Sequence, residues 1–226
     1  IMTKILISTC IFFNTDYSNK LLKTFPYLVD SLHILREIYD VDMIVYYDST
    51  VPEHIIEYYR DKGVILKKED KGESFYGFFW RLNSYNIKGY DIYIFRDIDL
   101  RLEENDLIIM DTFIKSDRHV YYSFAGKLRN KYPRVGYVLA GFFGIKNTVV
   151  FDFEKEIEHF KLNNNLEKYG ADEKFLAKTL YLRYQPIIFC ERKLYNSCVS
   201  KFKTNKLNLP DDYEIYVLLD KFKFFI

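Results

Sequence analysis

Strand patterns and helix patterns alternate along the first hundred residues of this chain. Runs rich in β-branched and aromatic residues predict strands at 4–13, 42–47, 64–66 and 90–96. Apolar residues recur at helical spacing over 18–39, 53–62 and 74–85, and Pro26 is expected to kink or break the first of these helices. Such alternation favours a mainly parallel central sheet with helices on both faces.

The second half of the chain has a less regular pattern. It predicts helices at 104–116, 152–163 and 172–183, and strands at 119–124, 137–143, 186–190 and 213–218. No repeat, low-complexity tract or linker divides the sequence, and its 226 residues suit one domain. The fold class expected is therefore a single α/β domain, 1–226, with a less regular C-terminal part.

Composition excludes several classes of partner. The net charge of +1 gives no support for a nucleic-acid partner. The longest apolar run, 136–145, is about half of the roughly 20 residues that cross a bilayer, so we expect no membrane span. Cys10, Cys190 and Cys198 are too scattered for a disulfide framework or a zinc site. With no signal-peptide pattern before the first strand, these features predict a cytoplasmic protein.

Two carboxylates follow the strand at 90–96, in the sequence Arg96-Asp97-Ile98-Asp99. Carboxylates held so close to an apolar core are costly unless a cation compensates them, and oxygen ligands of this kind suit Mg²⁺ or Mn²⁺. Ligands bind at the carboxyl ends of strands in α/β sheets. A single Asp in such a place is usually a turn residue, but the pair predicts a divalent metal that grips a diphosphate.

Other strand ends are also polar. The first strand ends near Thr9 and Cys10, and the second ends at Asp48, so these residues are expected at the same edge as Asp97. The turn after the first strand, 9–16, contains no glycine, and no phosphate-binding loop pattern is present. A bound nucleotide would therefore be held by metal and side chains.

Three further motifs have both a structural and a functional interpretation. Arg81 precedes the Asp-x-Asp strand and is either a surface arginine or a partner of a phosphate or site carboxylate. Gly141 interrupts an apolar strand, which indicates sheet packing or close approach of a ligand such as a sugar ring. Asp172 opens an apolar helix, either as its N-cap or as a general base whose pKa the helix N-terminus lowers.

With these motifs in order, the chain resembles small GT-A-fold glycosyltransferases, in particular a group known from large DNA viruses of algae and amoebae and from some bacteria. The resemblance spans about residues 3–180. The matching segments are Phe75-Tyr76-Gly77-Phe78-Phe79-Trp80-Arg81, Arg96-Asp97-Ile98-Asp99, Leu139-Ala140-Gly141-Phe142-Phe143-Gly144 and Gly170-Ala171-Asp172-Glu173-Lys174-Phe175-Leu176.

The resemblance implies transfer of a sugar from a nucleotide-sugar donor to an acceptor hydroxyl of a glycan or protein-glycan. A UDP-type donor is favoured over a GDP-type donor, with Mn²⁺ or Mg²⁺ as cofactor and an inverting reaction. It also implies a nucleotide-binding half at about 1–102 and an acceptor or catalytic half at about 103–226. The location implied is the cytoplasm, which for a viral protein is the cytoplasm of the infected host cell. The alternative function is a non-catalytic glycan- or nucleotide-binding module with the same fold.

The resemblance also assigns roles residue by residue. Asp97 and Asp99 match the metal positions, and Asp172 matches the catalytic base. The donor-binding set implied is Thr9, Cys10, Asp48, Arg81, Arg96, Asp97 and Gly141. The chain departs from the family at two places, because no His follows residue 180 and the loop 126–134 lacks the His of the family version. Any further metal ligand is then Glu191, Asp211, Asp212 or water.

Overall fold

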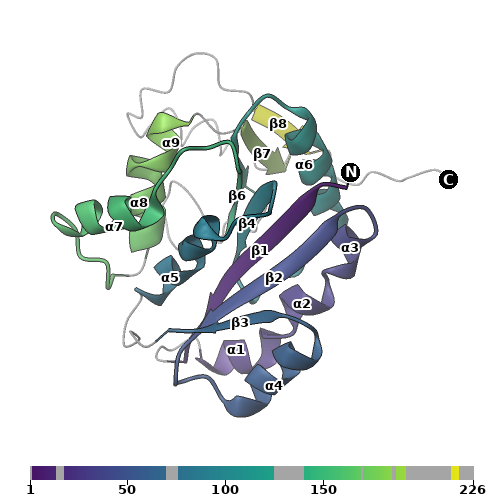
Figure 1. Ribbon diagram of the computed structural model, residues 1–226, viewed down its shortest axis with the longest axis vertical. Coiled ribbons are helices and arrows are strands. Elements are labelled where there is room, and N and C mark those ends of the chain that lie inside the picture. The colour runs from purple at the N-terminus through teal and green to yellow at the C-terminus, as the bar shows by residue number, and fades with distance from the viewer. Residues whose placement is uncertain are drawn as a thin grey trace.

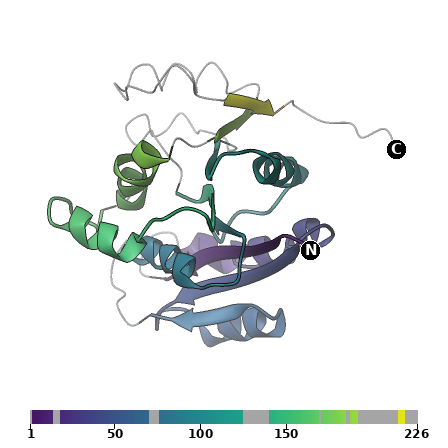
Figure 2. The same ribbon diagram turned by 45° about the horizontal axis from the view of Figure 1, so that its top comes forward.

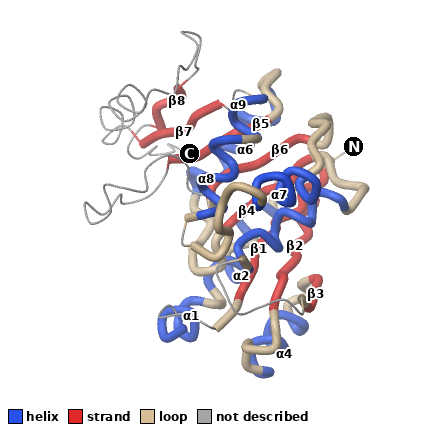
Figure 3. Tube along the Cα trace, turned by 90° about the vertical axis from the view of Figure 1, so that its left-hand side faces the viewer, coloured by secondary structure: helices blue, strands red, loops and turns tan. Residues whose placement is uncertain are grey.

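The computed structural model describes residues 2–13, 18–69, 76–124, 140–168, 170–184, 187–191 and 215–218. Their strands form one eight-stranded sheet in the order β3-β2-β1-β4-β6-β5-β7-β8 (Figure 1). Figure 3 shows the strands as a continuous red band with β3 and β8 at its ends. The bounds are β1 (Lys4–Ile11), β2 (Asp40–Tyr47), β3 (Ile65–Lys68), β4 (Ile92–Arg96), β5 (Val120–Phe124), β6 (Phe142–Lys146), β7 (Ile187–Glu191) and β8 (Ile215–Leu218).

The sheet is mostly parallel, as the alternating pattern predicted. β1 pairs in parallel with β2 and β4, β2 with β3, β5 with β7, and β7 with β8. Among the described strands, β6 runs against its two neighbours, β4 and β5. The carboxyl ends of β1, β2 and β4 therefore lie at one edge of the sheet, where an α/β fold presents its ligands.

Helices cover both faces of the sheet, because alternate residues of its strands enter two separate cores. Leu6 of β1 belongs to the core under α5, α7 and α8, whereas Ile5 and Ile7 belong to the core under α2, α3, α4 and α6. Figure 2 shows α5, α7 and α8 on the side of the sheet opposite α6. The bounds of these helices are α2 (Tyr27–Asp30), α3 (His33–Arg36), α4 (Glu53–Asp61), α5 (Gly77–Trp80), α6 (Glu104–Lys115), α7 (Phe153–Lys161) and α8 (Ala171–Lys178).

Four predicted elements differ from those in the structure. The helix expected at 18–39 is divided into α1 (Ser18–Thr24), α2 and α3, with the expected break beside Pro26. The helix expected at 74–85 is a short α5 followed by the 3₁₀-helix η1 (Arg81–Asn86). In place of the strand expected at 137–143, Ala140 and Gly141 form a turn before β6, and 137–139 lie outside the described residues.

The helix expected at 172–183 is also interrupted, so that α8 is followed by α9 (Leu180–Arg183). None of the helices in the described part of the chain is long and apolar enough to cross a membrane. The loop 126–134, and with it the departure from the family pattern there, lies outside the described residues, as do Asp211 and Asp212.

Candidate functional site

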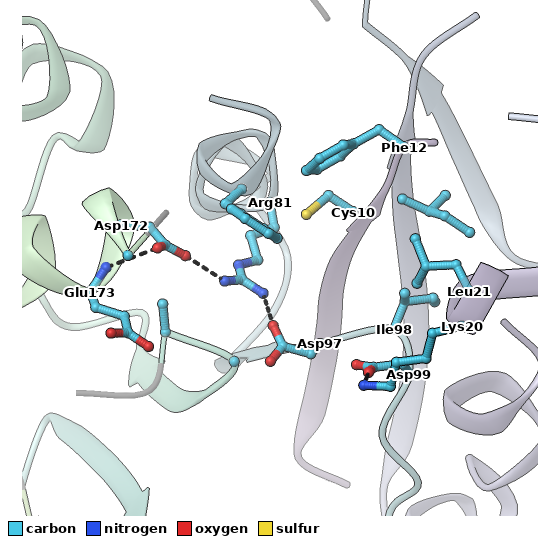
Figure 4. A pocket seen from close by; sticks show the side chains of 15 residues that line it. Cys10, Phe12, Lys20, Leu21, Arg81, Asp97, Ile98, Asp99, Asp172 and Glu173 are labelled. Atoms are coloured by element: carbon cyan, nitrogen blue, oxygen red, sulfur yellow. Dashed lines mark hydrogen bonds and ion pairs between the residues drawn. The ribbon is translucent and has the colours of Figure 1, made fainter. Parts of the chain in front are cut away.

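A cavity of about 270 Å³ opens at the carboxyl ends of β1 and β4 (Figure 4). Its lining comes from both halves of the chain. Charged side chains contribute Lys20, Arg81, Asp97, Asp99, Asp172 and Glu173, and the rest of the lining is Cys10, Ile11, Phe12, Leu21, Phe78, Ile98, Ala140, Gly141 and Gly170. The fold thus brings together residues of the four sequence motifs that contain Arg81, Asp97, Gly141 and Asp172.

Arg81 is the centre of the polar network in this cavity. Its side chain is only 2% exposed, yet its guanidinium joins two carboxylates (Figure 4). Nη1 donates to Oδ1 of Asp97 at 2.6 Å, and Nη2 donates to Oδ2 of Asp172 at 2.9 Å. These two negative charges outweigh the cost of burial and raise the pKa of Arg81. The interpretation of Arg81 as a surface residue is therefore wrong, and it meets site carboxylates as the alternative interpretation proposed.

The backbone around Arg81 is also fixed. Its carbonyl oxygen accepts hydrogen bonds from Oγ of Ser8 at 2.7 Å and from Oγ of Ser84 at 2.9 Å. Ser8 lies on β1, so the first turn of η1 is attached directly to the central sheet. A side chain with both ends held in this way has a defined position before any ligand binds.

Gly141 makes room for the carboxylate of Asp97. A Cβ atom at position 141 would lie 2.2 Å from Cγ of Asp97 and within 2.4 Å of both its oxygens, closer than non-bonded atoms approach. Because Gly141 lies in the turn before β6, the interpretation as a glycine inside a strand is wrong. The close approach that the sequence indicated is made by a carboxylate of the protein itself.

Asp99 has a different kind of partner. It forms an ion pair with Lys20 of α1, whose side chain is 53% exposed (Figure 4). The ion pairs and hydrogen bonds of the described residues thus engage Oδ1 of Asp97 and Oδ2 of Asp99. One oxygen of each carboxylate remains for another ligand.

The donor set at Asp97 and Asp99 fits a divalent cation that a substrate helps to bind. The described residues contain no cluster of three or more His, Cys, Asp or Glu side chains that could hold a metal ion. Mg²⁺ is commonly bound by one or two carboxylates together with water and substrate phosphates. Two carboxylates at the cavity are therefore sufficient for an ion whose remaining ligands come from water and a diphosphate.

Asp172 lies in the first turn of α8, but it is not the N-cap. Gly170 is the N-cap, with φ of 76°, and Asp172 is the second residue of the helix. Burial raises the pKa of Asp172, and the Arg81 guanidinium opposes this rise. The expectation that the helix N-terminus lowers this pKa is wrong, because the loss of water around the buried carboxyl outweighs the favourable contacts.

Glu173 is a site residue that the sequence reasoning missed. Its carboxyl lines the cavity next to Asp172, and its Oε2 is buried without a hydrogen-bond partner among the described residues. Burial, with the negative charges of Asp172 and Asp97, raises the pKa of Glu173 to about 8. The signal in the sequence was the second acidic residue of Gly170-Ala171-Asp172-Glu173, since two adjacent carboxylates at the start of an apolar helix are costly to bury together.

The remaining members of the predicted donor-binding set lie in different places. Cys10 lines the cavity, and burial raises the pKa of its thiol to about 12, so it stays protonated. Arg96 does not line the cavity but pairs with Asp106 of α6 at 2.8 Å and donates to the carbonyl oxygen of Arg101 at 3.0 Å. It therefore joins the end of β4 to the start of α6.

Thr9 and Asp48 lie beside the cavity and do not line it. Both are buried at the edge where β1 and β2 end. Oδ1 of Asp48 accepts a hydrogen bond from the Thr50 amide at 3.0 Å, and Oγ1 of Thr50 accepts one from the Phe13 amide at 2.8 Å. Among the described residues, Oγ1 of Thr9 and Oδ2 of Asp48 have no hydrogen-bond partner.

Solved structures share this fold, whereas no protein-family profile and no curated protein matches the sequence. A putative nucleotide-diphospho-sugar transferase from Desulfovibrio desulfuricans G20 superposes with a TM-score of 0.51 at 9% identity, over 90% of this chain and 96% of that chain. This likeness shows the fold, a GT-A-like α/β domain with a mainly parallel central sheet flanked by helices, as the sequence resemblance implied.

This chain also matches part of two longer solved structures. S. aureus TarS in complex with UDP matches with a TM-score of 0.49 and 16% identity, over 78% of this chain and 54% of that chain. The mannosyltransferase PcManGT from Pyrobaculum calidifontis, in complex with GDP-Man and Mn²⁺, matches with a TM-score of 0.47 and 10% identity, over 81% of this chain and 53% of that chain. The chain thus spans about half of the length of the solved TarS segment 1-349 and of PcManGT.

Proposed function

We propose that this protein is a metal-dependent glycosyltransferase that moves a sugar from a nucleotide-diphosphate sugar to an acceptor hydroxyl. The observation that carries the proposal is the meeting of Asp97, Asp99 and the buried Arg81 in one cavity at the carboxyl edge of a GT-A-like sheet. Carboxylates with spare oxygens beside a fixed guanidinium suit a cation and a diphosphate. The fold is also that of a putative nucleotide-diphospho-sugar transferase.

In this proposal Asp97 and Asp99 hold Mn²⁺ or Mg²⁺, and a bound ion supplies charge stabilisation for the diphosphate leaving group. Arg81 keeps the Asp97 carboxylate in position through its 2.6 Å hydrogen bond. Gly141 leaves the space that this carboxylate needs. We further propose a UDP-type donor, a glycan or protein-glycan acceptor and an inverting reaction. Thr9 and Asp48, whose buried oxygens lack partners among the described residues, would contact the nucleoside end of the donor.

The experiment is an assay of nucleoside-diphosphate release from UDP-GlcNAc, other UDP-hexoses and GDP-Man, with Mn²⁺, with Mg²⁺ and with a chelator. We expect metal-dependent release from a UDP-sugar, and a metal-dependent increase in melting temperature when UDP is added. Asp99→Asn should reduce UDP affinity in Mn²⁺ by at least about tenfold, because a metal ligand loses its charge. Asp117→Asn, at a side chain that is 95% exposed, is the matched control.

The competing function, a binding module that kept the fold, gives a different result. Such a module would bind UDP or a glycan and release no nucleoside diphosphate under any metal condition. Unchanged UDP affinity in Asp99→Asn would argue against a metal site at this edge of the sheet. The two results are independent, because the first tests turnover and the second tests the role of one carboxylate.

A further inference from the structure

The cavity contains two adjacent carboxyl groups that are placed very differently. Both oxygens of Asp172 are engaged, since Oδ2 accepts from Arg81 at 2.9 Å and Oδ1 accepts from the Glu173 amide at 3.0 Å. Glu173 has no ion pair of its own in the described structure, and its buried Oε2 has no hydrogen-bond partner there. In Figure 4 the Asp172 carboxylate points toward Arg81, whereas the Glu173 side chain extends away from that guanidinium.

An acceptor hydroxyl that gives up a proton needs an oxygen lone pair that is within reach and not already used. At Asp172 the hydroxyl would have to displace a charge-assisted hydrogen bond from a guanidinium, which is among the stronger bonds in proteins. Glu173 also lines the cavity, and among the described residues it has no ion pair that the hydroxyl would have to displace. The contacts therefore favour Glu173 as the place where a hydroxyl binds.

We infer that Glu173 is the catalytic residue that accepts the proton of the attacking hydroxyl, and that Asp172 is a positioning residue that fixes Arg81. The inference rests on the proposed glycosyl transfer. In the reaction the acceptor O–H bond breaks and its proton moves to the Glu173 carboxylate. The electron pair of the acceptor oxygen forms the new bond to the anomeric carbon, and the bond from that carbon to the diphosphate breaks with its electron pair on the departing nucleoside diphosphate.

The charges around Glu173 suit this role. Asp172 on the same helix and Asp97 beyond β4 are negative, and Arg81 on η1 is positive and already shared between those two carboxylates. The resulting pKa of about 8 makes Glu173 a stronger base than an ordinary glutamate, and a base is most effective when its pKa lies near the working pH. Burial also raises the pKa of Asp172, so the two carboxyl groups are distinguished by geometry, because both oxygens of Asp172 are already engaged.

The test uses release of nucleoside diphosphate from the UDP-hexose that the wild-type protein turns over, with Mg²⁺ and with water or a sugar as acceptor. For the wild type, kcat/KM should increase with pH through a single midpoint above the usual range of a glutamate carboxyl and then level off. Glu173→Gln should lower kcat by about 10²- to 10⁴-fold and remove this dependence, with UDP affinity within about twofold of wild type. Glu173→Asp should keep the dependence on pH and at least tenfold more activity than the Gln variant.

Two comparisons make the result specific. Glu154→Gln replaces an exposed glutamate in the first turn of α7 and should keep the wild-type rate and pH profile. Asp172→Asn should lower activity and keep a pH dependence, because the proton acceptor is still present, but its midpoint should move to lower pH because one of the negative charges that raise the pKa of Glu173 is gone. A flat wild-type profile between pH 6 and 9 would overturn the inference, as would a Glu173→Gln variant within threefold of wild type.

Equal losses in the Gln and Asp variants with the pH dependence intact would assign Glu173 a structural role only, and would also overturn the inference. Failure of the proposed function is distinguishable from all of these results. If the wild-type protein releases no nucleoside diphosphate from any UDP- or GDP-sugar, glycosyl transfer itself is contradicted.

Discussion

The rim and the interior of the cavity compensate their carboxylates in different ways. At the rim, Asp99 pairs with Lys20, a side chain that is about half exposed. In the interior, Arg81 and Asp172 are almost fully buried, at 2% and 7% exposed, and Arg81 also holds Asp97, whose side chain is 39% exposed. An exposed ion pair stabilises a fold by at most about 1 kcal/mol, whereas breaking a buried pair costs about 3–5 kcal/mol. In the proposed function a metal ion would therefore replace the rim cation, whereas the interior cation would stay in place.

The same comparison explains why the carboxyl group of Glu173 has no counter-charge of its own in the described part of the chain. Arg81 is the cation shared by Asp97 and Asp172, so the half-buried Glu173 lies near two negative groups without an ion pair of its own among the described residues. A buried carboxyl in such surroundings keeps its proton to a higher pH. The interior of the cavity thus combines one fixed ion pair with one group that can exchange a proton near neutral pH.

The largest effect is expected from removal of the interior cation. Arg81→Met should lower the free energy of unfolding by about 3–5 kcal/mol, because Asp97 and Asp172 lose their shared partner. The loss should increase from pH 5 to pH 8, because burial raises the pKa of Asp172 and release of its proton adds to the unpaired charge. Urea denaturation at the two pH values measures it. Arg60→Met, which breaks an exposed pair with Glu53 at 3.8 Å, is the control and should cost less than about 1 kcal/mol. Equal losses for the two variants would remove the distinction between rim and interior.

The second largest effect on stability is expected at Glu173, whose carboxyl group has no counter-charge of its own within the described structure. The pKa of Glu173 is raised in the folded state, so its proton stabilises the fold below the pKa of the unfolded chain, about 4.5, and this contribution is lost as pH rises toward 8. Glu173→Gln lacks this loss and should be more stable than wild type at pH 9, by on the order of 3 kcal/mol, with little difference at pH 4.5. Melting curves across this range measure the difference, with Glu154→Gln as the control. A gap that does not widen with pH would contradict the raised pKa.

A smaller effect is expected at the glycine beside Asp97. Gly141→Ala places a Cβ atom on the Asp97 carboxylate and should cost about 1–3 kcal/mol of stability. Gly63→Ala is a matched control, because its φ of +68° strains any alanine by about 1–2 kcal/mol while its Cβ meets no atom within 4 Å. Only the first variant should weaken UDP binding in Mn²⁺, by about tenfold or more, as calorimetry can measure. Similar UDP affinity in both variants would mean that the position of Asp97 is unimportant.

Much of the fold could be predicted from the sequence, because strand and helix periods are local signals. The strands of the first half lie where the apolar runs predicted them. The helix break lies beside Pro26, because proline has no backbone N–H to continue a helix. The positions of Thr9, Asp48 and Asp97 at one edge of the sheet follow from the parallel topology, in which strand ends share an edge. These predictions needed no knowledge of side-chain contacts.

What the sequence could not supply was the assignment of partners inside the cavity. Arg81 and Arg96 each follow an apolar segment of the sequence. Arg96 nevertheless pairs with Asp106 outside the cavity, whereas Arg81 lines the cavity. Asp172 and Glu173 are adjacent acids, and only the contact with Arg81 separates their roles. Such choices depend on distances of a few ångströms between distant segments, which residue types and spacing do not encode.

The smallest stability effect and the sharpest test of the comparison are expected at the rim. Lys20→Met should change the free energy of unfolding by less than about 1 kcal/mol, because the pair with Asp99 is exposed. If the ammonium occupies the carboxylate until a metal arrives, Mn²⁺ must displace it. Removing it should then tighten UDP binding in Mn²⁺ by up to about fivefold, the equivalent of an exposed ion pair. Lys23→Met, at an exposed lysine of the same helix, is the control and should leave the affinity unchanged. Weaker UDP binding in Lys20→Met, to the same degree with Mn²⁺ and with a chelator, would instead mean that Lys20 binds the diphosphate itself, and the rim cation would then be as permanent as the interior one.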